Sequence, residues 1–289
     1  MILLVWELRR RPRLPIEVCE NILDHIVPER GPVEVTTDTT AWETLVSCMK
    51  VCKDWYPCAR KNLWRHVVEG QSNVSSIYKD HEYLLPHLNE LDVGLNPSYS
   101  PTSSFFITRQ AANLHTLSLM RPNMPKEHVL FYRSPIFRTV RTLFLVLEHE
   151  LQASQLARLI NAFPSLSSLT LMLVGVELGH KGQVLPPARK PIPSLSYLYL
   201  TLLPGVFRLI DWLAKAGLLA SLKTLFLSSD TNNSVAEFRS HFEGVDRLIN
   251  NCGSSVEDLT LSFYRFPISD DVETPGISIF SLPMNLVTF

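Results

Sequence analysis

A six-residue pattern of apolar and polar positions recurs along most of the chain. Each copy reads apolar-x-x-apolar-x-apolar, and successive copies begin 26 to 34 residues apart. The copies begin at Leu88, Leu114, Val140, Leu166, Leu195, Leu222 and Val256. Because one residue separates the last two apolar positions, these positions share a face of an extended strand. The pattern therefore predicts a series of short strands, each with one buried face.

Segments with helical periodicity lie between several of these copies. Apolar residues recur every three or four positions over residues 151–163, 206–218 and 235–249. A strand and then a helix, repeated, predicts an α/β fold of parallel strands with outer helices, in which neighbouring units stack to bury their apolar faces. An eighth copy begins at Leu286, close to the last residue. We therefore expect a frayed or truncated C-terminal edge, an expectation that an ordered capping strand would refute.

The first 70 residues follow a different, helical pattern. Leu14-Pro15 precedes an apolar stripe that runs to Ile26, and proline is well tolerated in the first turn of a helix. Residues 28–40 contain Pro, Gly and a Thr-rich run, as expected of a linker. Two further helices are predicted, one bearing Leu45 and Cys52 and one bearing Trp55 and Leu63. The pattern predicts a small three-helix module before the strands.

Composition and charge argue against several classes of protein. The formal net charge is −1, so the basic excess of a general nucleic-acid binder is missing. No apolar run approaches the 18 or so residues that a membrane span needs. The arginines after Ile2–Trp6 follow the apolar run, whereas in a signal peptide they precede it, so residues 1–12 are interpreted as a leader. The odd count of 5 cysteines favours a reducing, intracellular compartment, cytoplasmic or nuclear.

The repeated strand–helix unit resembles a degenerate leucine-rich repeat. The family consensus places Asn or Cys three positions after the last apolar residue of each copy, and only Asn96 matches here. We therefore expect irregular turns, and the most mobile loops at residues 178–193 and 230–233, where Gly, Pro and Asn gather. The resemblance implies a leucine-rich-repeat-like solenoid over residues 71–289, incomplete at its C-terminal end.

The helical start resembles an F-box, a module of roughly 50 residues. The resemblance rests on three strings: Leu14-Pro15-x-Glu17-Val18, then Val51-Cys52-Lys53-x-Trp55, then Leu63-Trp64. It places an F-box at residues 13–70, and its one departure is the long linker between the first two helices. F-box followed by leucine-rich repeats is a known combination, and the whole chain resembles a fungal-type receptor of this kind.

The resemblance implies a non-catalytic role in protein degradation. F-box modules dock on a Skp-family adaptor, which joins them to a cullin-RING ubiquitin ligase, while the rest of the chain selects a protein substrate. The adaptor-binding residues that it implies are Leu14, Pro15, Ile22, Leu23, Leu45, Val51, Cys52, Trp55, Leu63 and Trp64. For Ile22, Leu45 and Trp55 a purely structural place in the helical core is an equal alternative.

The strand positions that point away from the buried face predict a substrate surface. Aromatic residues gather there in the middle turns, at Phe144, Tyr197, Tyr199 and Phe226, on the expected concave side. The alternative is ordinary β-propensity, which favours these residue types on any half-exposed sheet. No basic stripe accompanies them, so neither a phosphate nor a nucleic acid is expected to bind.

Signals for catalysis and for metal binding are poor. The sequence has no G-x-G-x-x-G, P-loop, G-x-S-x-G or H-E-x-x-H motif. Cys48, Cys52 and Cys58 lack the C-x-x-C spacing of a zinc site, so helix packing is the favoured role and no metal or cofactor is expected. Two classes remain open: a substrate receptor of a ubiquitin ligase, and an interaction scaffold without ligase function whose helical start only caps the solenoid.

Overall fold

The fold is described from a computed structural model that divides into two units, Met1–Val67 and Val68–Phe289. The structure describes residues 15–26, 39–51, 53–69, 82–94, 111–120, 135–147, 153–173, 194–202, 206–230, 245–246, 248–252, 255–264 and 277–283. The predicted leader, Leu14, Cys52, most of the linker, the whole loop over residues 178–193, residues 231–233 and the eighth copy at Leu286 lie outside the described residues. Among the described helices, none is both long and apolar enough to span a bilayer.

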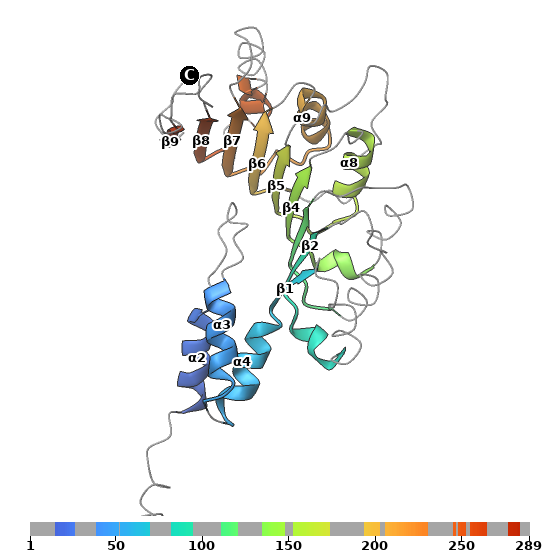
Figure 1. Ribbon diagram of the computed structural model, residues 1–289. Helices are drawn as coiled ribbons and strands as arrows, with labels where there is room; N and C mark the ends of the chain where they lie inside the picture. The colour runs from blue at the N-terminus through green and yellow to red at the C-terminus, as the bar shows by residue number, and fades with distance from the viewer. Residues whose placement is uncertain are drawn as a thin grey trace, which may run out of the picture. The chain divides into compact units, whose positions relative to one another are not determined.

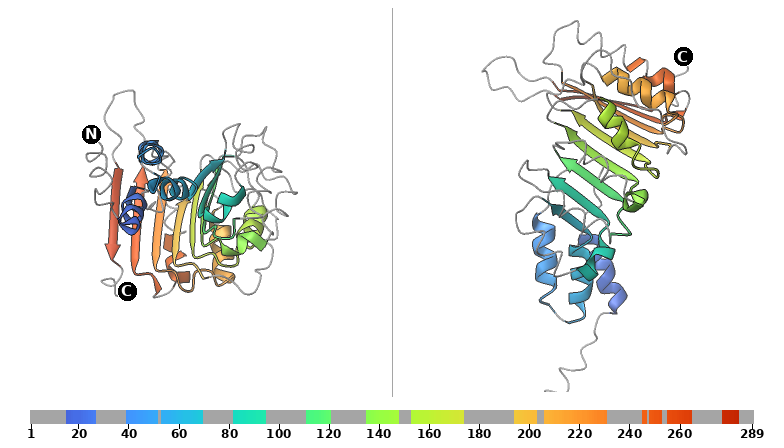
Figure 2. Two further views of the ribbon diagram at one scale, coloured as in Figure 1. Left: turned by 90° about the horizontal axis from the view of Figure 1, so that it is seen from below. Right: turned by 90° about the vertical axis from the view of Figure 1, so that its right-hand side faces the viewer.

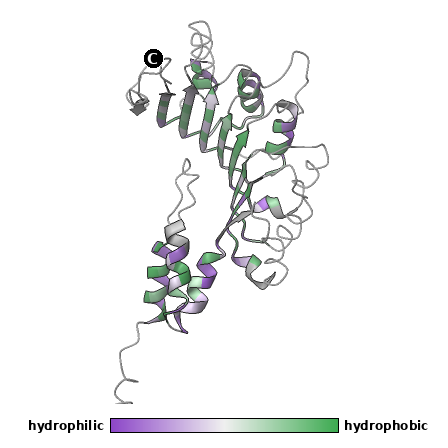
Figure 3. Cartoon of the chain, viewed as in Figure 1, coloured by the Kyte–Doolittle hydropathy of each residue, from purple (hydrophilic) through white to green (hydrophobic). Residues whose placement is uncertain are grey.

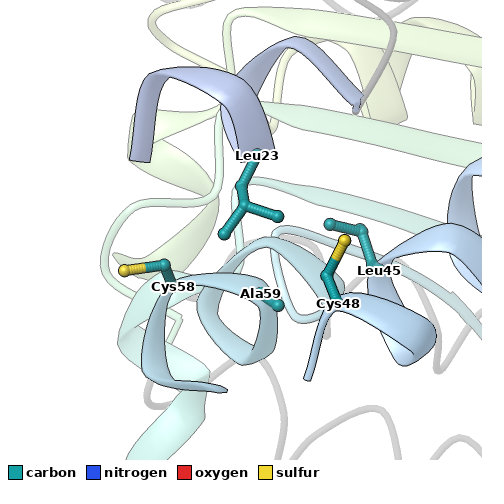
Figure 4. Close-up of a cluster of buried hydrophobic side chains, with 5 residues drawn as sticks. All are labelled: Leu23, Leu45, Cys48, Cys58 and Ala59. Carbon is teal, nitrogen blue, oxygen red and sulfur yellow. The ribbon is translucent and has the colours of Figure 1, made fainter. Parts of the chain in front are cut away.

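The described part of the first unit contains three helices, α2 (Ile16–Ile26), α3 (Thr39–Cys48) and α4 (Trp55–Leu63) (Figure 1). Helix α2 begins directly after Pro15, whose carbonyl accepts the first helical hydrogen bonds. The three helices share a small core, in which Leu23 of α2 points between α3 and α4 (Figure 4). The buried members of this core are Leu23, Leu45, Cys48, Cys58 and Ala59. The expected three-helix module is therefore confirmed.

The second unit is built on a sheet whose strand order follows the chain (Figure 1). Strands β2 to β8 run parallel to one another, and each contains the end of one predicted six-residue copy. The strands are β1 (His66–Glu69), β2 (Glu90–Gly94), β3 (Thr116–Met120), β4 (Thr142–Leu147), β5 (Ser168–Leu173), β6 (Tyr197–Leu202), β7 (Thr224–Asp230), β8 (Asp258–Tyr264) and β9 (Ile277–Pro283). A helical start followed by a parallel-stranded sheet confirms the predicted mixed α/β fold class.

The register of the sheet follows the repeated apolar positions. Leu117 of β3 is paired with Leu143 of β4, which is paired in turn with Leu169 of β5. The equivalent leucines continue this row through β6, β7 and β8, and all of them are buried. Figure 3 shows the hydrophobic residues along these strands. Stacking of identical apolar positions is thus what buries each strand's inner face.

Helices α8 (Ala153–Ile160) and α9 (Val206–Lys215) lie on the same side of the sheet (Figure 2). Two connections between strands contain short 3-10 helices, η2 (Glu82–His87) and η3 (Pro135–Thr139), which the periodicity of the sequence did not predict. Phe137 of η3 is fully buried and packs edge-to-face on Phe163, which follows α8, with ring centroids 5.7 Å apart. Phe137 thus occupies core space beside the sheet that a longer helix would otherwise cover.

Consecutive turns are joined by a repeated hydrogen-bond pattern just before each strand. The carbonyl of His115 accepts the amides of both Arg141 and Thr142, and the equivalent carbonyls do the same from β2 to β8. Side chains add bonds at the same level, where the hydroxyls of Ser167 and Ser196 donate to backbone carbonyls of the preceding turn. These serines join the turns in a chain that lacks the regular asparagines of the repeat consensus.

The C-terminal edge of the sheet differs from the expectation. Strand β9 runs antiparallel along the whole of β8, with Tyr264 opposite Ile277 and Asp258 opposite Pro283. An ordered strand therefore covers this edge, and the expectation of a frayed edge is wrong. The pattern of six-residue copies could not reveal β9, because an antiparallel strand that reverses the chain breaks the repeat.

Candidate functional site

The predicted adaptor-binding residues divide into an internal and an external set. Leu23 is fully buried and Leu45 is nearly so, and both belong to the core of the helical unit. Trp55 and Leu63 are partly buried and pack against the same core. Trp64 is also partly buried and ends α4, where its amide donates to the carbonyls of Arg60 and Lys61. Leu23, Leu45, Trp55 and Leu63 therefore pack the three helices together, while Trp64 caps α4.

The external set is exposed in spite of being apolar. Pro15 is exposed at the start of α2, Ile22 is 42% exposed and Val51 is 63% exposed. Among the described residues, every large exposed hydrophobic side chain lies in the helical unit. Besides Ile22 and Val51, these are Ile16, Val18 and Tyr56, which sequence reasoning left out of the site.

The geometry of α2 explains why its apolar residues do not all face inward. Cys19, Leu23 and Ile26 are spaced by four and three residues, so they form the stripe that meets α3 and α4. Val18 and Ile22 each precede a member of that stripe by one residue, which rotates them about 100° around the helix. They therefore flank the buried stripe. The i, i+4 spacing of Val18 and Ile22 is the signal that could have found Val18.

Charge is distributed unevenly over the helical unit. Helix α2 carries Glu17, Glu20 and Asp24 and no lysine or arginine. The turn after α3 and the helix α4 carry Lys50, Lys53, Arg60 and Lys61, with Asp54 as the acidic residue among them. Arg60 lies over the ring of Tyr56, with 5.7 Å between its guanidinium carbon and the ring centroid. Two differently charged surfaces thus accompany the exposed apolar residues.

The described cysteines of the helical unit are packed inside it as free thiols. Cys19, Cys48 and Cys58 are all buried, and the thiol of Cys58 lies 3.8 Å from a carboxylate oxygen of Glu20. Burial, with a contribution from Glu20, raises the pKa of Cys58, so its thiol stays protonated at neutral pH. A protonated thiol is a poor nucleophile and a poor zinc ligand. In the described part of the chain, no three acidic, His or Cys side chains form a group suited to a metal ion.

The predicted substrate residues occupy one face of the sheet. Asp92, Ser118, Phe144, Thr170, Tyr199, Phe226 and Thr260 are in register across β2 to β8 and form what we call the central row. Tyr199 and Phe226 are stacked, with ring centroids 4.6 Å apart and planes inclined by 15°. Phe226 and Phe144 remain partly exposed, whereas Tyr199 is only 3% exposed.

Tyr197 lies on the same face, two residues before Tyr199, and in register with Thr224. Its side chain is partly exposed. Burial, and to a smaller extent Tyr199, raises the pKa of Tyr197 to about 12, so its hydroxyl remains a hydrogen-bond donor at neutral pH. The structure therefore brings Tyr197, Tyr199 and Phe226 together and leaves Phe144 two strands away, on β4.

Comparison with known proteins identifies one part of the chain. Residues 12–69 match the sequence profile of the F-box-like family. No curated protein showed significant sequence similarity to the chain. The matched segment contains all three helices of the first unit and the exposed apolar residues on them. The chain therefore carries an F-box-like domain at residues 12–69.

Proposed function

We propose that this protein is the substrate-recognition subunit of a Skp-cullin-F-box ubiquitin ligase. F-box domains generally bind Skp-type adaptors, and the helical unit is an F-box-like domain. The observation that carries the proposal is that Ile16, Val18, Ile22, Val51 and Tyr56 are all exposed on this one unit. Exposed apolar residues gathered on a small unit are typical of a protein–protein interface.

The energetic reason is the size of the helical unit. Three short helices bury a core of few residues, and each fully buried aliphatic side chain stabilises a fold by about 1.5–3 kcal/mol. Contact with an adaptor would remove the remaining exposed surface of Ile22 and Val51 from water. In this proposal Leu23 and Leu45 shape the interface from inside, while Pro15, Ile22 and Val51 touch the adaptor.

The second unit has the role of substrate binding in this proposal. Its stacked parallel strands support a leucine-rich-repeat-like solenoid, and one sheet face presents Phe144, Tyr197 and Phe226, each partly exposed. Aromatic side chains on a rigid sheet are effective anchors for a protein segment. The chain itself supplies no catalytic residue in this role, and it acts inside the cell, in the cytoplasm or nucleus.

The substrate surface is tested by truncating its exposed rings. Phe144→Ala and Phe226→Ala should each remove a bound protein partner. Phe144→Ala should leave the melting temperature nearly unchanged, whereas Phe226→Ala should lower it slightly, because it also loses the stacking on Tyr199. Tyr199→Ala is a poorer probe, because Tyr199 is buried and its loss weakens the sheet itself. The matched control is Thr142→Ala, a partly exposed residue two positions from Phe144 on the same face. Unchanged capture of every partner by both phenylalanine variants contradicts a role for this surface.

The adaptor role is tested by co-purification of the full chain with a Skp-family adaptor. Stable co-purification supports the ligase subunit, and adaptor variants that cannot reach cullin should then break the link to the ligase. The alternative is an interaction scaffold in which the helical unit only caps the solenoid. That alternative predicts no adaptor binding, with partner capture by the sheet face intact.

A further inference from the structure

The sheet face that carries the central row has charge of one sign. Alternate positions of each strand belong to this face, from Glu90 of β2 to Ser262 of β8. The charged side chains that the structure describes there are Glu90, Asp92 and Asp258, and the described positions of the face contain no lysine, arginine or histidine. Asp92 is buried, whereas Glu90 is partly exposed and Asp258 is exposed. The accessible charge on the described face is therefore acidic.

Basic residues that precede the strands belong to the opposite alternation. His115, Arg141 and Lys223 each stand one residue before the first position of this face on their strand, so strand geometry directs them away from it. Lys223 also forms an ion pair with Glu257, with 3.3 Å between its Nζ and a carboxylate oxygen. These basic residues therefore do not change the acidic character of the face.

Acidic and aromatic side chains come together on β7 and β8. The ring of Tyr199 is stacked on one face of the Phe226 ring, with centroids 4.6 Å apart. Because Tyr199 belongs to β6, the other face of Phe226 is turned towards β8, where the residue in register is the smaller Thr260. Asp258 stands two residues before Thr260, which places its Cα roughly 8 Å from that of Phe226 at the usual strand spacing. Phe226 and Thr260 are partly exposed and Asp258 is exposed, so a partner has access to them.

We propose that this place, the β7–β8 subsite formed by Phe226, Asp258 and Thr260, binds an arginine side chain of a positively charged protein segment. Binding at the subsite rests on the proposed substrate role of the sheet, and it identifies the class of substrate as basic. A guanidinium lying on the free face of Phe226 gains a cation–π contact and donates hydrogen bonds to the carboxylate of Asp258. The acidic face disfavours acidic or phosphorylated segments and nucleic acid, because like charges would meet.

The experiment measures the affinity of the full chain for labelled peptides by fluorescence polarisation. Three peptides of equal length alternate serine with arginine, with lysine or with glutamine, and the buffer has physiological ionic strength to screen distant charges. The arginine peptide should bind at least roughly tenfold more tightly than the glutamine peptide. It should also bind more tightly than the lysine peptide, because only a guanidinium combines flat stacking with a two-point bond to a carboxylate.

Two variants of the subsite and one matched control locate the binding. Asp258→Asn should weaken binding of the arginine peptide by roughly two- to fivefold. Phe226→Leu keeps an apolar side chain but removes the aromatic face, and should weaken binding by a similar factor. Glu257→Gln removes the same charge from the adjacent exposed residue, which strand alternation directs to the opposite side, and should leave the affinity nearly unchanged. Equal melting temperatures of Asp258→Asn and Glu257→Gln will show that both variants fold.

Three results would overturn the inference. Equal affinity for the arginine and glutamine peptides contradicts a basic substrate, and equal affinity for the arginine and lysine peptides contradicts the guanidinium. Equal weakening by Asp258→Asn and Glu257→Gln contradicts the subsite, because the attraction would then come from net charge alone. Titration of the same preparation with a Skp-family adaptor separates these failures from failure of the proposed function. A chain that binds the adaptor but not the arginine peptide retains the proposed function and loses this inference, whereas a chain that binds neither loses both.

Discussion

The two units of this chain treat their apolar residues in different ways. In the strand unit, the row of leucines from Leu91 on β2 to Leu259 on β8 is buried, and each lies beside its equivalent in the next turn. In the helical unit, Leu23 and Leu45 are buried, but neighbouring apolar residues such as Ile22 and Val51 are exposed. Both units are rich in apolar side chains, and among the described residues the most exposed large ones lie in the helical unit.

The difference shows how burial separates structure from function. In a stacked repeat every strand lies beside a neighbouring strand, so the apolar face of each strand is buried within the chain. A small helical unit buries few residues, and its described residues Ile22 and Val51, which are exposed, are available to a partner. Two adjacent residues of α2 therefore differ in role: Leu23 stabilises the core, and Ile22 is exposed for binding.

The largest expected effect is a loss of stability in the strand unit. Leu169→Ala removes a fully buried side chain from the middle of the sheet and should destabilise this unit by about 3–5 kcal/mol, because the neighbouring turns cannot close the cavity. Ser168→Ala, next to it on the opposite face, should change the free energy of unfolding by less than about 0.5 kcal/mol. Denaturant unfolding measures both. Similar losses for the two variants would contradict the assignment of faces.

A second pair of substitutions sharpens the contrast within α2. Leu23→Ala should lower the stability of the helical unit by about 2–4 kcal/mol, because Leu23 is the centre of a small core. Ile22→Ala should lower it by less than about 1 kcal/mol and should weaken adaptor binding instead. Thermal unfolding and adaptor titration separate the two effects. Equal destabilisation by both variants would mean that Ile22 is a core residue.

A smaller effect is expected at the end of α9. Gly217 has φ of 75°, and the bonds from Gly217 to Ala214 and from Leu218 to Leu213 close the helix as in a Schellman motif. Gly217→Ala should cost about 1 kcal/mol from backbone strain alone, because an added Cβ meets no atom within 4 Å. Ala216→Gly beside it is the control for glycine content. An unchanged stability for Gly217→Ala would contradict the left-handed conformation.

The smallest effect at neutral pH is expected for Tyr197→Phe. The pKa of Tyr197 is raised from 10 to about 12 in the folded chain, so the folded state holds its proton more tightly than the unfolded state. Its contribution to stability is complete below pH 10 and is lost as pH rises towards 12. Wild type should therefore lose stability relative to Tyr197→Phe over this window, and parallel denaturation profiles for the two proteins would contradict the shift.

Much of the fold could be predicted because the repeat carries its own register. Leu143 and Leu169 occupy the same place in successive six-residue copies, and the structure pairs them directly. Strand β9 could not be predicted, because it runs antiparallel and breaks the period. The 3-10 helix η3 was missed because it buries one aromatic residue, Phe137, and lacks the apolar stripe by which a longer helix is recognised.

The candidate site was less predictable than the fold. A motif string such as Val51-Cys52-Lys53-x-Trp55 names residues that belong together and does not say which of them are buried. Exposure depends on how the chain packs in three dimensions: Val51, in the turn after α3, is exposed, whereas Trp55 packs against the core. Tyr56 was overlooked because it stands between the motif residues. Tyr199 shows the same limit on the sheet, where stacking on Phe226 accompanies nearly complete burial of a ring expected on the surface.

The central claim is that the exposed apolar residues of the helical unit bind a Skp-family adaptor. Calorimetric titration of the full chain with the purified adaptor tests it, using wild type, Ile22→Glu and Val51→Glu. The account predicts that wild type binds and that each variant loses at least about tenfold in affinity, or 1.4 kcal/mol, with an unchanged melting temperature. Absence of wild-type binding, or wild-type affinity in both variants, would contradict it.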